Sequence, residues 1–382
     1  MRTDKKRRND PPKVLMEVCL IWLLLLFASG ASHASESESR TILDETFSWL
    51  TPDEADRMLT KVKRAGFNVI IPVVWHGRGT SWPSRLAPSE PLWDKKGNKS
   101  YHDPLRYLIE KAHTMGMEVH PWFTVSLRQR DFLHEFYDSG TPAKAFNIHL
   151  PDFRSYIVSL MLEVVKNYDV DGINMDYIRS MGICESPFCI EDYRNRMHRD
   201  LMTDAKEKEG TLAWTSIAKW NADAVEDILE RFSREAKALK SHLVISVSSH
   251  AGLPLLVNQG TDSIRWANLN WIDVIFHMEY ATTDQFRWQL LNKALDDLKD
   301  PKKLVLMVGN YEQSSLNKDL VWARNAQTVA DLVTLSQEYG QGGNGIALYE
   351  YPYLSDRQIE KLRLGPFRES TRASWRKHGE TR

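Results

Sequence analysis

The sequence predicts an α/β protein with a (β/α)8 barrel in a single domain. Short runs rich in Val and Ile recur along the chain, and a helical pattern of apolar residues separates each run from the next. Regular alternation of this kind implies a parallel sheet, and eight units allow the sheet to close into a barrel. An open doubly wound sheet is the alternative, but no GxGxxG or GxxxxGK[ST] motif follows an early strand, so its nucleotide-binding forms lose support.

The first units are delimited by helix start and stop signals. The run Thr51-Pro52-Asp53-Glu54 combines an N-cap, a Pro in the first turn and a capping-box Glu, and the apolar stripe that follows ends at Gly66. Asp103-Pro104 opens the next helix, which ends at Gly116. The first three strands are expected at Thr41–Glu45, Phe67–Val74 and Met117–Phe123.

Five further units complete the barrel. Each is a helix followed by a strand, expected at Phe153–Asn167 and Val170–Tyr177, Ala222–Leu239 and Leu243–Ser248, Asp262–Asn268 and Ile272–Tyr280, Phe286–Leu298 and Lys303–Val308, and Asn325–Tyr339 and Gly345–Tyr351.

The first 34 residues are expected to form a secretory signal peptide. Basic residues at 5–8 precede the apolar run Val14–Ala28, and Ser32-His33-Ala34 supplies small residues for cleavage after Ala34. The apolar run is short for a membrane span of about 20 residues, which favours cleavage over an uncleaved anchor. We therefore expect a secreted or periplasmic protein without a stable membrane span, with a spacer at 35–39, the barrel at 40–364 and a mobile basic tail at 365–382.

Charge and cysteine content limit the classes of partner and cofactor that we expect. The formal net charge is −1, so nothing indicates a nucleic-acid partner. Cys184 and Cys189 are close enough in sequence to form a small-loop disulfide in an oxidising compartment, although the spacing alone does not exclude two free thiols. No set of metal ligands accompanies them, and we expect neither a metal nor a cofactor.

The most informative stretch is Tyr168–Ser180, YDVDGINMDYIRS, a buried strand that ends on Asp176. Active sites of barrels lie at the C-terminal ends of the strands, so Asp176 is a candidate catalytic group. The plain alternative is an Asp that caps the next helix or pairs with Arg179. Other strand ends carry Glu279, Glu312 and Glu350. Hydrolysis of a glycosidic bond needs two carboxylates, and no Ser-His-Asp elbow or HExxH helix competes with that interpretation.

Three segments carry a family resemblance: GFNVIIPVVWHGRGTSWPS, DPLRYLIEKAHTMGMEVHPWF and FRSYIVSLMLEVVKNYDVDGINMDYIR. In their order and spacing they resemble the bacterial glycoside-hydrolase-like barrels related to glycosyl hydrolase family 10, from about Arg40 to Asp356. The resemblance implies a secreted TIM-barrel glycosidase that acts on bacterial polysaccharide, and some relatives act on cell-wall glycan strands stripped of peptide. It also implies that Asp176 is the strand-four carboxylate and that Met278 and Tyr280 form a strand-six M-x-Y pattern.

The predicted catalytic residues are Asp176 with Glu279 or Glu350 as its partner. The predicted substrate-binding residues are Arg78, His120, Trp122, Asn174, Tyr177, Arg179, Tyr280 and Glu312. The chain departs from the family pattern at Asn174, where a His is common, and from the chitinase pattern DxxDxDxE at Ile178.

Two questions stay open at this point. Side-chain alternation permits either Glu279 or the pair Met278 and Tyr280 to face the barrel interior, and either Tyr349 or Glu350 on the last strand. Because fold does not determine function, a sugar-binding barrel without catalysis is the alternative to a glycosidase.

Overall fold

The computed structural model describes residues 37–96, 103–208, 210–339, 345–371 and 373. The expected signal peptide and its cleavage point lie outside these residues. Within the described part of the chain, no helix is both long enough and apolar enough to cross a membrane.

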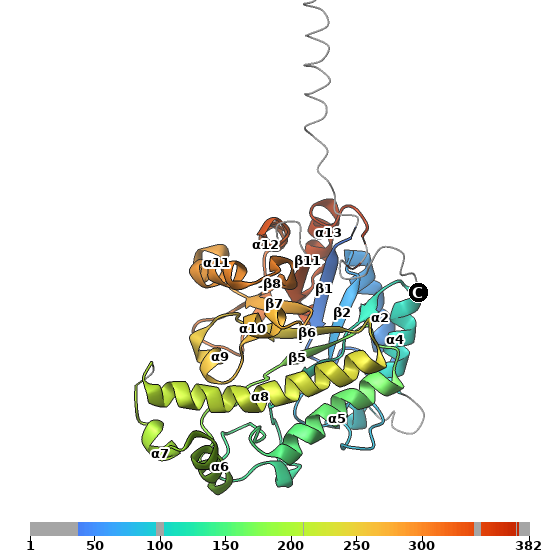
Figure 1. Cartoon of the computed structure of the whole chain (residues 1–382). Coiled ribbons are helices and arrows are strands. Elements are labelled where there is room, and N and C mark those ends of the chain that lie inside the picture. The colour runs from blue at the N-terminus through green and yellow to red at the C-terminus, as the bar shows by residue number, and fades with distance from the viewer. Residues whose placement is uncertain (1–36, 97–102, 209, 340–344, 372, 374–382) are drawn as a thin grey trace, which may run out of the picture. The chain divides into compact units, whose positions relative to one another are not determined.

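Eight strand positions form a closed parallel barrel, which confirms the predicted fold class. The strands are β1 (Ser39–Asp44), β2 (Val69–Trp75), the interrupted pair β3 (Glu118–Val119) and β4 (Trp122–Thr124), β5 (Gly172–Asp176), β6 (Val244–Ser249), β7 (Val274–Glu279), β8 (Leu304–Gly309) and β11 (Gly345–Tyr349). Strand β1 pairs in parallel with both β2 and β11, so the sheet has no free edge. In Figure 1 the blue strand β1 lies beside the red strand β11.

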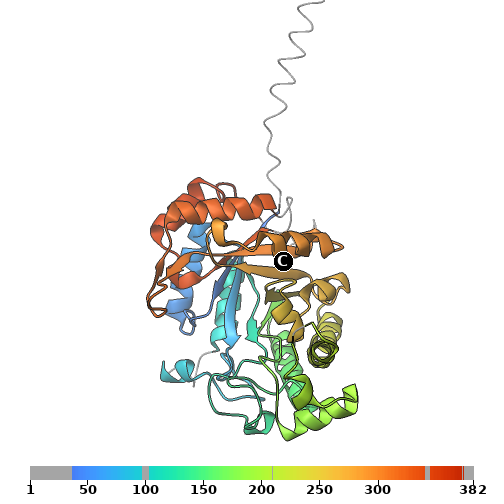
Figure 2. The same cartoon turned by 90° about the vertical axis from the view of Figure 1, so that its left-hand side faces the viewer.

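Helices cover the outside of the barrel. The main ones are α2 (Pro52–Ala65), α4 (Pro104–Thr114), α5 (Pro151–Asn167), α8 (Leu212–Leu239), α10 (Ser263–Asn268), α11 (Trp288–Asp297), α12 (Ala326–Tyr339) and α13 (Asp356–Leu364). Helix α13 packs against both α12 and α2, so the first and last units of the chain meet there (Figure 2). The capping box at Thr51 and the left-handed Gly66, with φ of 97°, delimit α2 as the sequence predicts.

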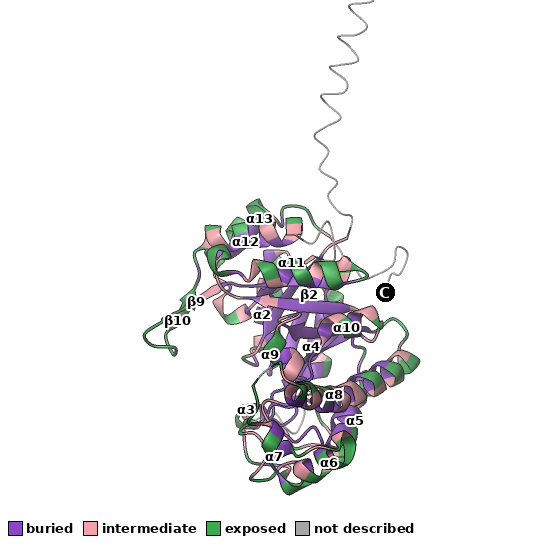
Figure 3. Ribbon diagram, turned by 60° about the vertical axis from the view of Figure 1, so that its left-hand side comes forward, coloured by how far each residue is buried: buried purple, intermediate pink, exposed green. Residues whose placement is uncertain are grey.

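The hydrophobic core fills the barrel and the layer between strands and helices, and Figure 3 shows the buried residues in these layers. Every residue of β1, β2, β6 and β8 is buried. A parallel strand is covered on both faces in such a fold, which explains the apolar runs VIIPVVW of β2 and LVLMVG of β8. The polar strand ends are therefore the exception that needs explanation.

The sequence prediction places the start of the mobile tail too early in the chain. Phe367 is fully buried, its ring lies edge-on to Phe67 at 5.2 Å, and the Arg40 guanidinium carbon lies 4.4 Å from its centroid. Residues 365–371 therefore belong to the barrel, because one buried aromatic ring anchors an otherwise polar segment. Residues 374–382 lie outside the described part of the chain.

The chain makes a long excursion between β5 and α8 that the sequence pattern did not predict. It contains α6 (Pro187–Met197) and α7 (Leu201–Asp204), and it builds a small second core around Tyr193 and Trp220. The structure joins Cys184 and Cys189 in a disulfide at its start. Helix α8 begins at Leu212 rather than at Ala222, because its first turns pack against this second core instead of the barrel.

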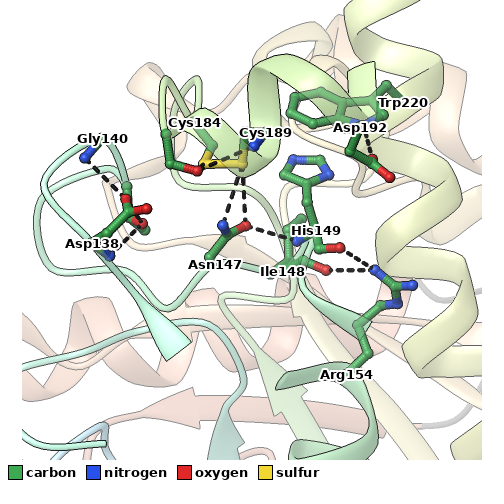
Figure 4. The surroundings of a disulfide bond; sticks show 12 residues. Asp138, Gly140, Asn147, Ile148, His149, Arg154, Cys184, Cys189, Asp192 and Trp220 are labelled. Atoms are coloured by element: carbon green, nitrogen blue, oxygen red, sulfur yellow. Dashed lines mark hydrogen bonds between the residues drawn. A yellow bond between two sulfur atoms is a disulfide. The ribbon is translucent and has the colours of Figure 1, made fainter. Parts of the chain in front are cut away.

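The excursion is tied to the barrel by the segment before α5 (Figure 4). The Asn147 amide nitrogen lies 3.3 Å from the Cys189 sulfur, and the His149 ring stacks on the Trp220 indole at 3.4 Å. The buried Arg154 guanidinium donates to the carbonyls of Ile148 and His149.

Three other elements were also not expected. Two are the short helices α3 (Pro91–Lys95) and α9 (Pro254–Asn258), which lie in loops. The third is an antiparallel hairpin between β8 and α12, made of β9 (Tyr311–Gln313) and β10 (Val321–Ala323).

Candidate active site

A cavity of about 220 Å³ opens at the C-terminal ends of the barrel strands. Two carboxylates line it, Glu45 after β1 and Asp176 at the end of β5. The aromatic rings in its wall belong to Trp122, Tyr177, Tyr280 and Tyr349, and the basic side chains to Arg179 and His250. Barrel enzymes build their sites at this end, from loops that several strands contribute.

The alternation of β5 delivers Asp176 to the cavity. Asn174, two residues earlier, points into the barrel, where its amide nitrogen donates to Ser246 Oγ at 3.0 Å and its carbonyl accepts from Ser248 Oγ at 3.2 Å. Residues two apart on a strand share a face, so Asp176 also points inward, into the cavity at the C-terminal end of the barrel. Asn174 is therefore part of the barrel interior and does not line the cavity.

The strand ends abruptly at Tyr177. This residue has φ of 47°, a left-handed conformation that is uncommon for a residue other than glycine. The Ser126 hydroxyl lies within hydrogen-bonding distance of the Tyr177 and Arg179 carbonyls, at 2.5 and 2.7 Å, and so holds the turn. Backbone conformations of this kind persist where the surroundings enforce them, often in functional sites. The turn brings the Tyr177 and Arg179 side chains to the cavity wall.

Burial raises the pKa of the Asp176 carboxyl to about 6. The Tyr177 backbone N–H, which donates to Asp176 Oδ1 at 2.6 Å, and the Arg179 charge oppose this shift, while the negative charge of Glu45 adds to it. A carboxyl with such a pKa carries its proton over part of the range near neutrality, as an acid catalyst must.

Glu45 is the second carboxylate of the cavity, and the sequence prediction did not single it out. Its Oε1 lies 3.0 Å from His76 Nε2, and its Oε2 accepts a hydrogen bond from the Tyr349 hydroxyl. Burial would raise the pKa of Glu45, but the hydrogen bonds and charge of His76 and the Tyr349 hydroxyl together lower it below the usual value of 4.5. Glu45 is therefore ionised where Asp176 still holds a proton.

The orientation of His76 follows from an irregularity in β2. The pairing of β2 with β4 shifts register between Val73 and Trp75, as in a β-bulge. Trp75 then packs against Phe132 and Phe146, and the next residue, His76, reaches Glu45. Bulges next to active sites commonly re-aim a side chain in this way.

Four of the predicted substrate-binding residues line the cavity: Trp122, Tyr177, Arg179 and Tyr280. The ring of Tyr349 stacks on Tyr280 at 4.8 Å and lies edge-on to Trp122 at 6.5 Å, so the aromatic wall is continuous. Flat aromatic surfaces beside carboxylates suit the CH faces and hydroxyl groups of a sugar.

The other predicted binding residues lie elsewhere. Arg78 is 3.3 Å from the buried Glu90 carboxylate, and its charge contributes to lowering the pKa of Glu45. His120 is fully buried inside the barrel, 3.1 Å from Glu118. Glu312 belongs to the hairpin β9–β10 and lines a separate groove.

The structure separates the two predicted partners of Asp176 from the cavity. Met278 and Tyr280 line it, whereas the intervening Glu279 is directed away and lies 3.1 Å from Arg287 Nε. On the last strand Tyr349 faces the cavity, and the adjacent Glu350 is buried behind it. Burial, with the charges of Glu45 and Asp44, raises the pKa of Glu350 to about 8.

The carboxylates of the site are not arranged as a metal centre. Among the described residues, no group of three or more His, Cys, Asp and Glu side chains could hold a metal ion.

Comparisons with known proteins show the family of the chain. Residues 42–145 and 128–323 match the model of the family described as glycosyl hydrolase-like 10. The chain is 24% identical over 291 residues to Glycosyl hydrolase DigH of Escherichia coli, covering 66% of this chain and 63% of that protein. It is 24% identical over 209 residues to Glycosyl hydrolase YngK of Bacillus subtilis, covering 50% of this chain and 38% of that protein. The chain thus spans less than two thirds of the length of these relatives.

Solved structures show the same fold. The glycoside hydrolase domain of PgaB (BpsB) from Bordetella bronchiseptica superposes with a TM-score of 0.61 at 11% identity, covering 86% of this chain and 98% of that one. Alpha-L-fucosidase isoenzyme 2 from Paenibacillus thiaminolyticus gives a TM-score of 0.57 at 16% identity, covering 85% of this chain and 48% of that one. With the family model matching most of its length, the chain belongs to the glycosyl hydrolase-like 10 family.

Proposed function

We propose that this protein is a secreted glycoside hydrolase that cleaves O-glycosidic bonds of a bacterial polysaccharide, with Asp176 and Glu45 as its catalytic pair. One observation carries the proposal: two carboxylates line one cavity, and their surroundings shift their pKa values in opposite directions. Carboxyl groups whose pKa values are pushed apart mark the acid and the base of a site.

Each carboxylate has a defined role in this mechanism. Protonated Asp176 donates its proton to the glycosidic oxygen as the bond to the anomeric carbon breaks. Ionised Glu45 then either attacks the anomeric carbon or takes a proton from the water that attacks it. His76 and Tyr349 hold Glu45 in its charged form through hydrogen bonds to both carboxylate oxygens. In this proposal Glu45 replaces Glu279 and Glu350 as the partner of Asp176.

The cavity wall supports a sugar substrate. Trp122 and Tyr280 offer ring faces for stacking, and Arg179 and Tyr177 offer hydrogen-bond donors beside Asp176. The family membership and the glycosyl hydrolase names of the relatives support the same reaction class. The predicted signal peptide and the Cys184–Cys189 disulfide support action outside the cytoplasm, because disulfides persist in oxidising compartments.

The test is an assay for new reducing ends. The mature protein is incubated with a panel of bacterial glycans that includes peptide-free cell-wall strands. Asp176→Asn and Glu45→Gln are assayed beside the wild type, with circular dichroism as a check of folding. We expect product from the wild type and a loss of at least about 10²-fold in each variant, since acid–base groups contribute about 10²–10⁴-fold.

The other outcomes are equally informative. If a folded Glu45→Gln variant keeps wild-type turnover, the proposed pair is wrong although the enzyme class stands. If the wild type binds a glycan but never releases reducing ends, the chain is a carbohydrate-binding barrel without catalysis.

A further inference from the structure

A second groove lies beside the catalytic cavity, and Tyr280 lines both. The groove has a volume of about 490 Å³. One wall is the hairpin β9–β10, which projects from the barrel in Figure 3, and the other is the segment that follows β7. The two hollows therefore meet at one aromatic ring.

The walls of the groove are fastened to each other by Arg324. Its buried guanidinium donates to the Gly309 carbonyl at 2.7 Å, to the Tyr280 carbonyl at 2.8 Å and to the Ala281 carbonyl at 3.2 Å. These bonds join the end of β8 to the segment after β7. Because the groove is formed in advance, a ligand entering it has less ordering entropy to overcome.

An exposed indole forms the rim of the groove. The Trp322 side chain is 44% exposed, yet its orientation is fixed because Nε1 donates to Glu312 Oε2 at 3.1 Å. Tyr311, on the opposite strand of the hairpin, continues the aromatic surface toward Tyr280, with 6.3 Å between ring centroids. A large apolar face held by a polar partner suits the CH face of a sugar ring.

The remaining lining groups favour a neutral ligand. Thr282, Gln285 and Gln313 contribute a hydroxyl and two amides, and Glu312 contributes a carboxylate. Arg324 is the single cation among the described lining residues; two of its nitrogens donate to backbone carbonyls, and its buried Nε faces Glu312 Oε1 at 3.9 Å. A sugar acid would therefore bring its negative charge toward Glu312 without a free cation to receive it.

The size of the catalytic cavity also requires an extension. Its volume of about 220 Å³ lies below the range of roughly 300–1,000 Å³ typical of ligand pockets. A polysaccharide bound there must continue outside it, and Tyr280 connects it directly to the second groove.

We propose that the groove between hairpin β9–β10 and the segment after β7 binds neutral sugar units of the same chain that is cleaved in the catalytic cavity. This inference rests on the proposed function, since it assigns the groove to that substrate. It makes the protein an enzyme of long glycans, with Trp322 as a residue that sets the preference for length.

The test compares chain lengths with Trp322→Ala in the mature protein. The probes are cello-, xylo- and chito-oligosaccharides from the disaccharide to the octasaccharide. Binding is measured by calorimetry in the Asp176→Asn background, and kcat/KM is measured with catalytic Asp176 intact. Leu316→Ala is the matched control, because Leu316 lies between the strands of the same hairpin, is 98% exposed and does not line the groove.

We expect Trp322→Ala to weaken octasaccharide binding by roughly three- to tenfold and to leave the disaccharide unchanged. The ratio of kcat/KM for long over short substrates should fall by the same factor. Trp322→Phe should restore part of the loss, and Leu316→Ala should match the wild type.

Two results would overturn the inference: equal loss for short and long chains, or no loss in Trp322→Ala. Failure of every probe to bind the Asp176→Asn protein would do the same. If long chains bind in a Trp322-dependent way but neither they nor the bacterial glycans of the reducing-end assay are cleaved, the groove assignment stands and the proposed hydrolase is refuted.

Discussion

Glu350 offers a quantitative test of the electrostatics at the end of the last strand. Glu350 as a whole is 9% exposed, and its Oε2 accepts no hydrogen bond from the described residues. The raised pKa of about 8, against an ordinary 4.5, means that the folded protein holds a proton that the unfolded chain releases. Such a group stabilises the fold fully below pH 4.5, and this contribution is lost as the pH rises through about 8.

The magnitude follows from these two values. Each pH unit between them is worth about 1.4 kcal/mol, so ionisation of Glu350 costs on the order of 3 kcal/mol at pH 7 and on the order of 5 kcal/mol above pH 8. Glu350→Gln replaces the carboxyl with a neutral group of the same shape. We therefore expect the variant to match the wild type near pH 4 and to be more stable by a few kcal/mol at pH 8.

Urea unfolding between pH 4 and pH 9, followed by circular dichroism, measures this difference. A stability difference that does not change with pH would refute the reasoning, because it would show that Glu350 has the same pKa in both states. The same variant addresses catalysis. Since Glu350 does not line the cavity, we expect turnover to persist, and a stable but inactive variant would restore Glu350 as the acid.

Three further predictions concern the catalytic pair and the barrel interior. The pH profile of kcat/KM should be bell-shaped. Activity should fall as the pH rises through about 6, where Asp176 loses its proton, and as it drops below 4.5, where Glu45 gains one. A flat profile across pH 4–8 would contradict the assignment. His76→Gln removes the main influence that lowers the pKa of Glu45, so the acid limb should move to higher pH by more than the alkaline limb; an unmoved acid limb would separate His76 from catalysis. Gly172→Ala should destabilise the fold by roughly 1–3 kcal/mol in urea unfolding. The new Cβ would lie 2.6 Å from the Val244 carbonyl oxygen, which belongs to a strand and cannot turn away. An unchanged urea midpoint would show that the barrel relaxes there.

The strand and helix pattern was sufficient to predict the barrel, because buried parallel strands and capped amphipathic helices leave distinct periodicities. Asp176 could be predicted for the same reason, since an acid that ends an apolar strand interrupts a clear pattern. The family resemblance also indicated the orientation of Met278 and Tyr280 that the structure shows.

The elements that the sequence did not reveal depend on irregular backbone. Glu45 follows the end of a short strand and carries no motif of its own. One signal was available: Glu45 continues the parity of Thr41, whose register partner Ala347 lies two residues before the inward-facing Tyr349. The role of His76 depends on a register shift that no periodicity displays. The sequence did not predict the hairpin β9–β10, because its polar, half-exposed strands resemble a loop.

Three buried acids lie at the β1–β11 seam, and their surroundings shift their pKa values in different directions. The negative charges of Glu45 and Asp44 both act on Glu350. Burial raises the pKa of Asp44 although Ser48 and Thr46 donate to its carboxylate. Burial, together with the negative charges of Glu45 and Asp44, raises the pKa of Glu350. Glu45 alone of the three is bonded by both His76 and Tyr349, and its pKa is lowered.

The lowered pKa of Glu45 has a catalytic consequence. Because His76 and the Tyr349 hydroxyl favour its ionised form, the acid that lines the cavity carries a negative charge. That charge in turn raises the pKa of Asp176 across the cavity, so the base helps to keep the acid protonated. Removing Glu45 as a charge, by Glu45→Gln, should therefore lower the pKa of Asp176. Titration of the Asp176 carboxyl by NMR in that variant measures the coupling, and an unchanged pKa would show that Glu45 does not influence it.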